Sequence, residues 1–433
     1  MGPELLPWRL ARSDVGRHRG GATPARLPEP PGALRLDRPA AVAEPDHRPE
    51  MAREPVLPRP DAHGSARRDP RLLPPLLPRR PRRQRTRAVA PMDPGSPAEL
   101  SLQRTLALLV MLVSLLAIAA ALIGPYSISP TQLIQAFAQR LTGRIDPALA
   151  ATDTVLFSVR LPRVAAALLA GAALAAAGAV YQGLFRNPLV SPDMLGVSSG
   201  AGLGAVLGIF LSLPVPAIQG LSFVGGLATV AIVYLLASAV RGHEPTLVLV
   251  LTGIVLGALA GACLSLLKIL ADPYDQLPAI TFWLLGSLAS VRAEDVLATA
   301  PLVLVALVPL VLLRWRVNLM SLGDEEAAAL GVDPRRLRLL FIAAATLMTA
   351  SIVAIAGVIG WVGLVIPHIA RLLVGPNFNR LLPTAMLIGA GFMLAVDTLA
   401  RTLAETETPL GVLTAFLGAP VFVWLLASGR RGW

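Results

Sequence analysis

From about residue 105 onward, the chain alternates long apolar runs with short polar segments. Several runs reach the roughly 20 residues that a helix needs to cross a bilayer. This pattern predicts ten membrane helices and therefore an all-α polytopic membrane protein. The predicted spans are 105–124, 161–182, 193–212, 221–240, 247–270, 296–313, 337–358, 360–374, 381–400 and 409–427.

Small residues recur at close spacing within these spans, as in GAALAAAGAV and SSGAGLGAVLG. Because lipid tails are as apolar as leucine, helices in a bilayer associate through close backbone packing, which small residues permit. We therefore expect a compact bundle. Gly360 and Gly363 are expected to mark a bend between the seventh and eighth spans.

The N-terminal segment, residues 1–95, differs in composition from the rest of the chain. Residues 1–91 contain 19 Arg and 10 Asp or Glu, so they carry +9 of the net charge of +11. Their prolines would break any helix, and no signal-peptide pattern is present. We predict a disordered Pro/Arg-rich extension, or a start codon assigned too far upstream, with Met92 near the true start. A basic arm for nucleic acid or anionic lipid is disfavoured, since aromatic residues that stack on bases are nearly absent, and no nucleic-acid partner is expected.

Basic residues in the short loops indicate the orientation of the spans. With both termini in the cytoplasm, the inside segments hold the larger set: Arg186, Arg241, Arg314, Arg316, Arg335, Arg336, Arg338, Arg371, Arg380, Arg430 and Arg431. The outside segments hold Arg140, Arg144, Arg160, Arg163, Arg292 and Arg401. We therefore expect a multi-pass protein of the cell (inner) membrane, and the outer arginines require a separate explanation.

Lys268 is the single lysine of the chain and stands in SLLKIL, with no glycine-rich turn before it. A phosphate-binding P-loop needs such a turn followed by Lys and Ser or Thr, so any nucleotide must be bound by another chain. His368 and the other scattered histidines show no metal-ligand spacing, and Cys263 is the one cysteine, so no metal, cofactor or catalytic site is expected. Lys268 either snorkels to the interface or attracts an anionic cargo. Asp397 is expected to pair with Arg401, four residues on.

An acidic segment, SLGDEEAAALGV at 321–332, interrupts the apolar pattern on the predicted cytoplasmic side. Ser321 can cap a helix, the three acids complement the helix dipole, and Gly331 can end the helix. The pattern predicts one or two short helices. They are either a solvated connector or a rigid docking surface for a soluble partner.

The order of motifs from about residue 104 to 428 resembles the FecCD family, the permeases of ABC importers for iron-siderophores, haem and cobalamin. The motifs that carry the resemblance are RLPRVAAALLAGAALAAAGAVYQGLFRNPLVSPDMLGVSSGAGLGA at 160–205, FWLLGSL at 282–288, SLGDEEAAALGV at 321–332, GVIGWVGLVIPHIARLLVG at 357–375, AVDTLAR at 395–401 and PLGVLTAFLGAPVFVWLL at 409–426. The N-terminal extension has no counterpart in the family.

The resemblance implies a type II ABC importer permease bundle at residues 96–433, with spans two to five and seven to ten related as inverted repeats. It implies two ATPase subunits, an external substrate-binding protein and a second permease copy, identical or paralogous, with no cofactor. The segment 318–334 would form the coupling helices that dock into the ATPase. The residues matched to that role are Leu322, Gly323, Asp324, Glu325, Glu326, Leu330 and Gly331.

The same resemblance gives roles to residues at the two membrane surfaces. Arg160, Arg163 and Arg401 would receive carboxylates of the binding protein, for which a planar guanidinium is suited; the alternative is that they anchor helix ends. Thr246 would lie at the cytoplasmic gate, or would simply cap its helix. The pathway would run between two copies, lined by spans 247–270 and 409–427.

The expected function is therefore that of a permease, not an enzyme, which imports an iron-siderophore with energy supplied by partner ATPases. A cobalamin or haem importer of the same family remains the first alternative. An ion-coupled secondary transporter would need more intramembrane ionisable groups. An intramembrane enzyme would need a clustered catalytic constellation within the spans, which the sequence does not offer.

Overall fold

The computed structural model describes residues 97–143, 146–240 and 245–427, and within these ranges the secondary structure is helical, without strands. The predicted extension at 1–95 lies outside the described residues. Three short elements, η1 (Pro147–Leu149), η2 (Thr154–Arg160) and η3 (Pro192–Leu195), accompany the α-helices. The α-helices are α1 (Pro97–Leu122), α2 (Pro130–Thr142), α3 (Ala150–Asp153), α4 (Leu161–Leu184), α5 (Val197–Phe210), α6 (Val215–Ala239), α7 (Pro245–Leu270), α8 (Gln276–Leu285), α9 (Ala293–Leu312), α10 (Arg314–Met320), α11 (Asp324–Ala329), α12 (Pro334–Ala356), α13 (Val362–Val374), α14 (Phe378–Thr402) and α15 (Leu410–Ala427).

Every one of the ten predicted spans contains an apolar helix, which confirms the prediction of an all-α membrane bundle. Seven stretches in the described part of the chain are long and apolar enough to cross a bilayer: 101–122, 147–184, 215–239, 246–270, 293–312, 334–356 and 378–402. The helices at the other three predicted spans, α5, α13 and α15, are shorter apolar segments. The inverted-repeat relation between the two halves stays a prediction.

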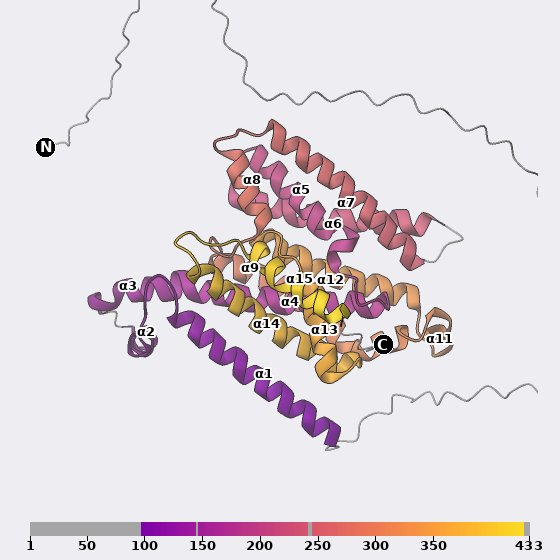
Figure 1. Cartoon of the computed structure of the whole chain (residues 1–433), viewed down its shortest axis with the longest axis horizontal. Helices are drawn as coiled ribbons and strands as arrows, with labels where there is room; N and C mark the ends of the chain where they lie inside the picture. Colours follow the sequence, from indigo (N-terminus) through magenta and orange to yellow (C-terminus); the bar gives the residue numbers. More distant parts are fainter. Residues whose placement is uncertain (1–96, 144–145, 241–244, 428–433) are drawn as a thin grey trace, which may run out of the picture. The chain divides into compact units, whose positions relative to one another are not determined.

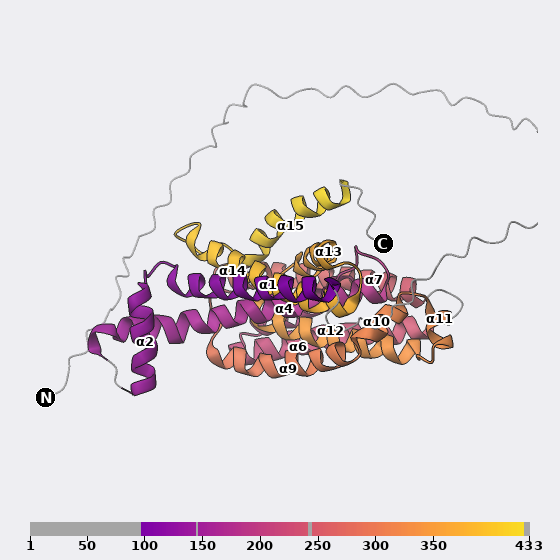
Figure 2. The same cartoon turned by 90° about the horizontal axis from the view of Figure 1, so that it is seen from below.

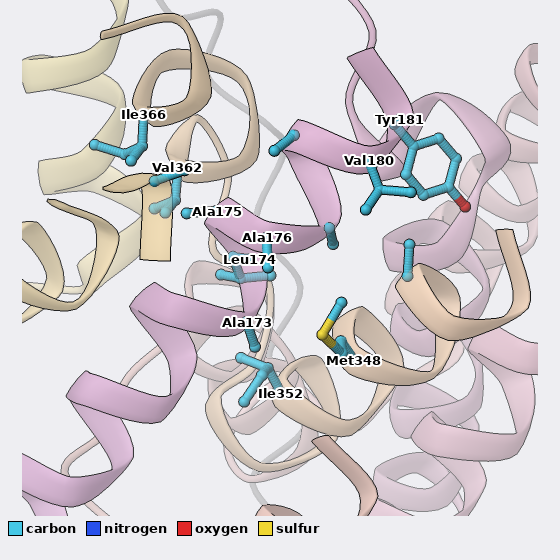
Figure 3. Close-up of a cluster of buried hydrophobic side chains, with 14 of the residues drawn as sticks. Ala173, Leu174, Ala175, Ala176, Val180, Tyr181, Met348, Ile352, Val362 and Ile366 are labelled. Carbon is cyan, nitrogen blue, oxygen red and sulfur yellow. The ribbon is translucent and has the colours of Figure 1, made fainter. Parts of the chain in front are cut away.

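Helix α4 lies at the centre of the bundle, and more than half of its residues are alanine or glycine. Most of its residues are buried, and it packs against α12, α13 and α14 (Figure 1). Figure 3 shows its alanines between Met348 and Ile352 of α12 and Val362 and Ile366 of α13. Small side chains let these backbones approach closely, so α4 is enclosed by helices rather than by lipid.

Two glycine contacts set how closely α4 approaches its neighbours. A Cβ on Gly171 would collide with the carbonyl oxygen of Gly389 in α14, and a Cβ on Gly178 would collide with that of Gly363 in α13. The expectation that Gly360 and Gly363 form the bend before α13 is therefore wrong for Gly363, which lies within the helix and serves this packing contact. The bend itself runs from Gly357 (φ 68°) to Trp361 (φ 70°).

Helices α5, α6 and α7 lie side by side next to this core, with α8 against α5 (Figure 1). Helix α8 ends within the FWLLGSL motif, at Leu285, and was not expected as a helix, because its ten residues are too few to span a bilayer. In Figure 2, α15 extends away from the helices around α4, and its contacts are with α8, α13 and α14.

Candidate functional site

The predicted coupling segment is two short helices, α10 and α11, joined by a tight turn. Helix α10 is fixed to the start of α14, since the Asn318 side chain donates to Asn377 Oδ1 (3.1 Å) and accepts from the Phe378 amide (2.8 Å). Val317 and Met320 on the same helix are buried. The segment is therefore held by the bundle and does not hang from it as a free loop.

Helix α11 begins two residues later than the capping prediction requires. Ser321 closes α10, where its hydroxyl donates to the Asn318 carbonyl (2.6 Å), and the residue before α11 is Gly323, at φ 137°. The prediction that Ser321 caps the acidic helix is wrong, because a glycine turn intervenes. Gly331 does follow the helix end in a left-handed conformation (φ 80°), as predicted.

One ion pair and two buried apolar residues fasten α11 to α12. The Arg338 side chain, 8% exposed, donates through Nη2 to both carboxylate oxygens of Asp324 (2.8 and 3.0 Å). Ala327 and Val332 are buried beneath the helix. Asp324 thus holds the segment in place, and the other two acids are free to face outward.

The outward face of the segment combines apolar and acidic side chains. Leu322 is 52% exposed and Leu330 is 58% exposed, and both Glu325 and Glu326 are exposed between them. A rigid, exposed protrusion with two leucines at its edges and two glutamates between them is suited to dock with a partner protein. All seven residues matched to the coupling role lie within this one segment, although the role itself stays untested.

The second predicted group, the three arginines, converges on the ends of α1, α4 and α14. Arg163 is 6% exposed, its Nε donates to Asp397 Oδ1 (2.8 Å), and its two Nη atoms bind Glu407 in a bidentate pair. Arg401 pairs with Asp397 Oδ2 (3.3 Å), which confirms the predicted i,i+4 contact. Asp397, fully buried, is thus shared between two guanidinium groups.

Arg160 and Arg401 also satisfy the free carbonyls at the C-terminal end of α1. Arg160 donates to Ala121 (2.7 Å) and Leu122 (2.9 Å), and also to the Tyr126 carbonyl. Arg401 donates to Ala120 (3.2 Å) and Ile123 (3.3 Å). The last turn of a helix leaves carbonyls without intrahelical partners, and cations are favourable there. All three arginines therefore have partners within the chain, so a docking partner would have to compete for them.

Thr246 is the second residue of α7 and is half-buried, so it lies inside the helix rather than at its cap. Among the described residues, no hydrogen bond or ion pair joins it to the coupling segment or to the arginines. Lys268 lies in the last turn of the same helix and is partly exposed. The gate role of Thr246 stays a prediction.

A pocket of about 650 Å³ opens between α8, the bend before α13, and α15. Trp361 forms part of its wall, packs edge-on against Phe422 (6.2 Å between ring centres) and lies directly against Gly418. Among the residues that the structure describes, no charged side chain lines this pocket. The lining residues are Leu284, Leu285, Val358, Gly360, Trp361, Gly411, Val412, Ala415, Phe416, Ala419 and Pro420.

Sequence reasoning missed Glu407 and the link from Arg163 to Asp397. These partners lie 244 and 234 residues from Arg163, so no local spacing could reveal them. One signal was available: Glu407 is an acid just before the apolar PLGVLTAF run, in a chain where acids near the spans are few. The pocket was also missed, since α8 was not expected as an element.

Comparisons with known proteins find matches that cover most of this chain. A model of the FecCD transport family matches residues 109–428. The molybdate import system permease protein MolB of Haemophilus influenzae is 42% identical over 325 residues, which cover 75% of this chain and 95% of MolB. The hemin transport system permease protein HmuU of Yersinia pestis is 40% identical over 284 residues, which cover 64% of this chain and 84% of HmuU.

A solved structure gives the same result for the fold. It is described as an inward-facing conformation of a metal-chelate type ABC transporter and is 41% identical to this chain. It superposes with a TM-score of 0.68 and covers 75% of this chain and 99% of its own. The described helices therefore follow a known permease architecture.

Proposed function

The chain belongs to the FecCD transport family and is an ABC importer permease, and we propose that its cargo is a ferric siderophore. In this proposal the permease lies in the cell (inner) membrane with both termini in the cytoplasm. Two ATPase subunits, an external substrate-binding protein and a second permease copy, identical or paralogous, complete the importer. No cofactor is required, because the chain moves its cargo and makes no covalent bond.

The coupling segment is the observation that supports ATP-driven transport most directly. Leu322, Glu325, Glu326 and Leu330 face outward from a helix pair that Asn318 and Arg338 fasten to the bundle. A surface that transmits motion must be both exposed and rigidly attached. An ion-coupled transporter has no use for such a surface, and the buried acid Asp397 that it would need is already engaged by two arginines.

The apolar pocket supports an organic chelate as the cargo. A ferric siderophore encloses its metal in an organic ligand, and the carbon skeleton of that ligand can lie against an apolar wall while its polar groups stay hydrated. An oxyanion such as molybdate, which the name of MolB specifies, would lose hydration there without gaining donors. Cobalamin and haem, the latter specified by the name of HmuU, have apolar faces too and remain the alternatives. Uptake of a labelled siderophore in the presence of unlabelled molybdate, haem or cobalamin distinguishes these cargoes, because only a compound that the importer accepts reduces the uptake.

Co-purification with the ATPase tests the coupling role. We expect the double variant Leu322→Asp with Leu330→Asp to reduce ATPase retained on the permease by about tenfold or more, because two apolar anchors become charged. The matched control is Leu141→Asp, since Leu141 is an 88% exposed leucine at the end of α2. Full retention of ATPase by the double variant would remove the coupling role from this segment.

A further inference from the structure

The connector between α14 and α15 holds an acid that reaches back into the bundle. Glu407 lies in this connector with its side chain 29% exposed, and its carboxylate accepts hydrogen bonds from both Nη atoms of Arg163. A guanidinium and a carboxylate in this fork geometry form one of the stronger hydrogen-bonded pairs in proteins. Glu405, two residues earlier in the same connector, is exposed.

Glu407 also lies where the two walls of the pocket meet. The Ser287 hydroxyl, just beyond α8, donates to Glu407 Oε1 (3.3 Å), and the Leu410 amide at the start of α15 donates to the Gly286 carbonyl (2.9 Å). Leu285 and Gly411, the neighbours of these two groups, line the pocket. One carboxylate therefore links the end of α8 and the start of α15 to α4.

The two acids bound to Arg163 differ in their freedom to leave. Asp397 is fully buried on α14 and also contacts Arg401. Its separation from the two arginines would leave unpaired charges inside the bundle. Glu407 is partly exposed on a connector and can exchange Arg163 for water. Arg163 would still be paired with Asp397 after Glu407 had left, so the release of Glu407 does not leave that guanidinium unpaired.

We propose that Glu407 is a latch: its ion pair with Arg163 and its hydrogen bond from Ser287 hold the start of α15 against α4 and the end of α8 at one end of the pocket, and release of Glu407 from Arg163 widens the pocket. The inference rests on the proposed function, since it gives the pocket a place on the transport pathway. Glu407 is then a positioning residue, because it acts through the two pocket walls. The separation of Glu407 from Arg163 is a local event in the connector and needs no nucleotide.

A cysteine-labelling experiment on the full-length permease in liposomes tests the latch. Cys263 is the only native cysteine, so Cys263→Ala gives a clean background, and Val412→Cys reports on the pocket wall. An ion pair with a partly exposed partner shifts an equilibrium by up to about fivefold. We expect Glu407→Gln to raise the rate of labelling by a water-soluble maleimide by about that factor, while the matched Glu405→Gln leaves it unchanged.

A cysteine at a fully buried position serves as the control for loss of fold. Ala345 in α12 has no exposed surface, so an Ala345→Cys reporter should stay unlabelled in every variant. An unchanged rate at Val412→Cys in Glu407→Gln would overturn the latch, and so would a parallel rise at Ala345→Cys, which would mean loss of fold. The experiment contains no ATPase and no cargo, so its failure is distinct from a failure of ATPase co-purification.

Discussion

At the scale of single residues, the buried arginines determine how α1, α4 and α14 are joined. Arg160 and Arg401 satisfy the carbonyls at the end of α1, and Arg163 binds two carboxylates. Reversing the charge of Arg163 would place three carboxylates together, so a loss of docking in such a variant would reflect misfolding as readily as a lost contact. A neutral replacement is the better probe.

Docking of the binding protein by Arg163 remains a proposal, and a matched pair of variants tests it. We expect Arg163→Met with Glu407→Gln to bind the substrate-binding protein about tenfold more weakly than wild type, because the charge is removed while Asp397 keeps its ion pair with Arg401 and residue 407 carries no charge. Glu407→Gln alone keeps the guanidinium and should bind at least as tightly as wild type. Titration calorimetry provides the two affinities. Equal affinity for the double variant and for Glu407→Gln would exclude Arg163 from docking.

The sequence identifies residue contacts only where they are local. The pair Asp397 and Arg401 follows from i,i+4 spacing and is confirmed. The pair of Arg163 with Glu407 joins the first turn of α4 to a connector near the end of the chain, and only the packing of α4 against α14 brings them together. The acidic helix was predicted, but its cap was not, since Gly323 rather than Ser321 precedes it.

At the scale of elements, glycine contacts set the distance between the central helices. Gly171 and Gly389 lie against each other's backbones where α4 crosses α14, and neither has room for a Cβ. The long hydrophobic runs predicted the positions of the membrane helices, because a span is recognised from about 20 consecutive apolar residues of the sequence itself. The bend before α13 was predicted, and Gly360 lies within it, but its bounds from Gly357 to Trp361 and the short helix α8 could not be predicted this way, since both depend on how the neighbouring helices pack.

The crossing predicts a contrast between two glycine substitutions. We expect Gly171→Ala to lower the free energy of unfolding by about 1–3 kcal/mol, because the added methyl must displace the α14 backbone. Gly220→Ala in α6 should be neutral or slightly stabilising, since nothing lies within 4 Å of the new Cβ and alanine favours a helix. Thermal unfolding in one detergent compares the two. Equal midpoints for both variants would contradict the close crossing.

At the scale of the whole molecule, the described chain is a helical permease with an apolar pocket and with an exposed pair of short helices, fastened to the bundle, at the predicted coupling segment. Its single lysine follows no glycine-rich turn, and the proposed function assigns ATP hydrolysis to partner subunits. The coupling segment and the pocket are built from different elements. Helices α10 and α11 form the coupling segment, whereas α8, α15 and the bend before α13 form the pocket. Motion of the bundle as rigid helices would connect them.

The most direct measurement is uptake of a radiolabelled ferric siderophore into liposomes that contain the permease, its ATPase and its binding protein. We expect uptake that requires ATP, ceases when the ATPase is omitted, and is lost in Leu322→Asp with Leu330→Asp. Uptake that continues without the ATPase and follows an imposed ion gradient would contradict ATP-driven import.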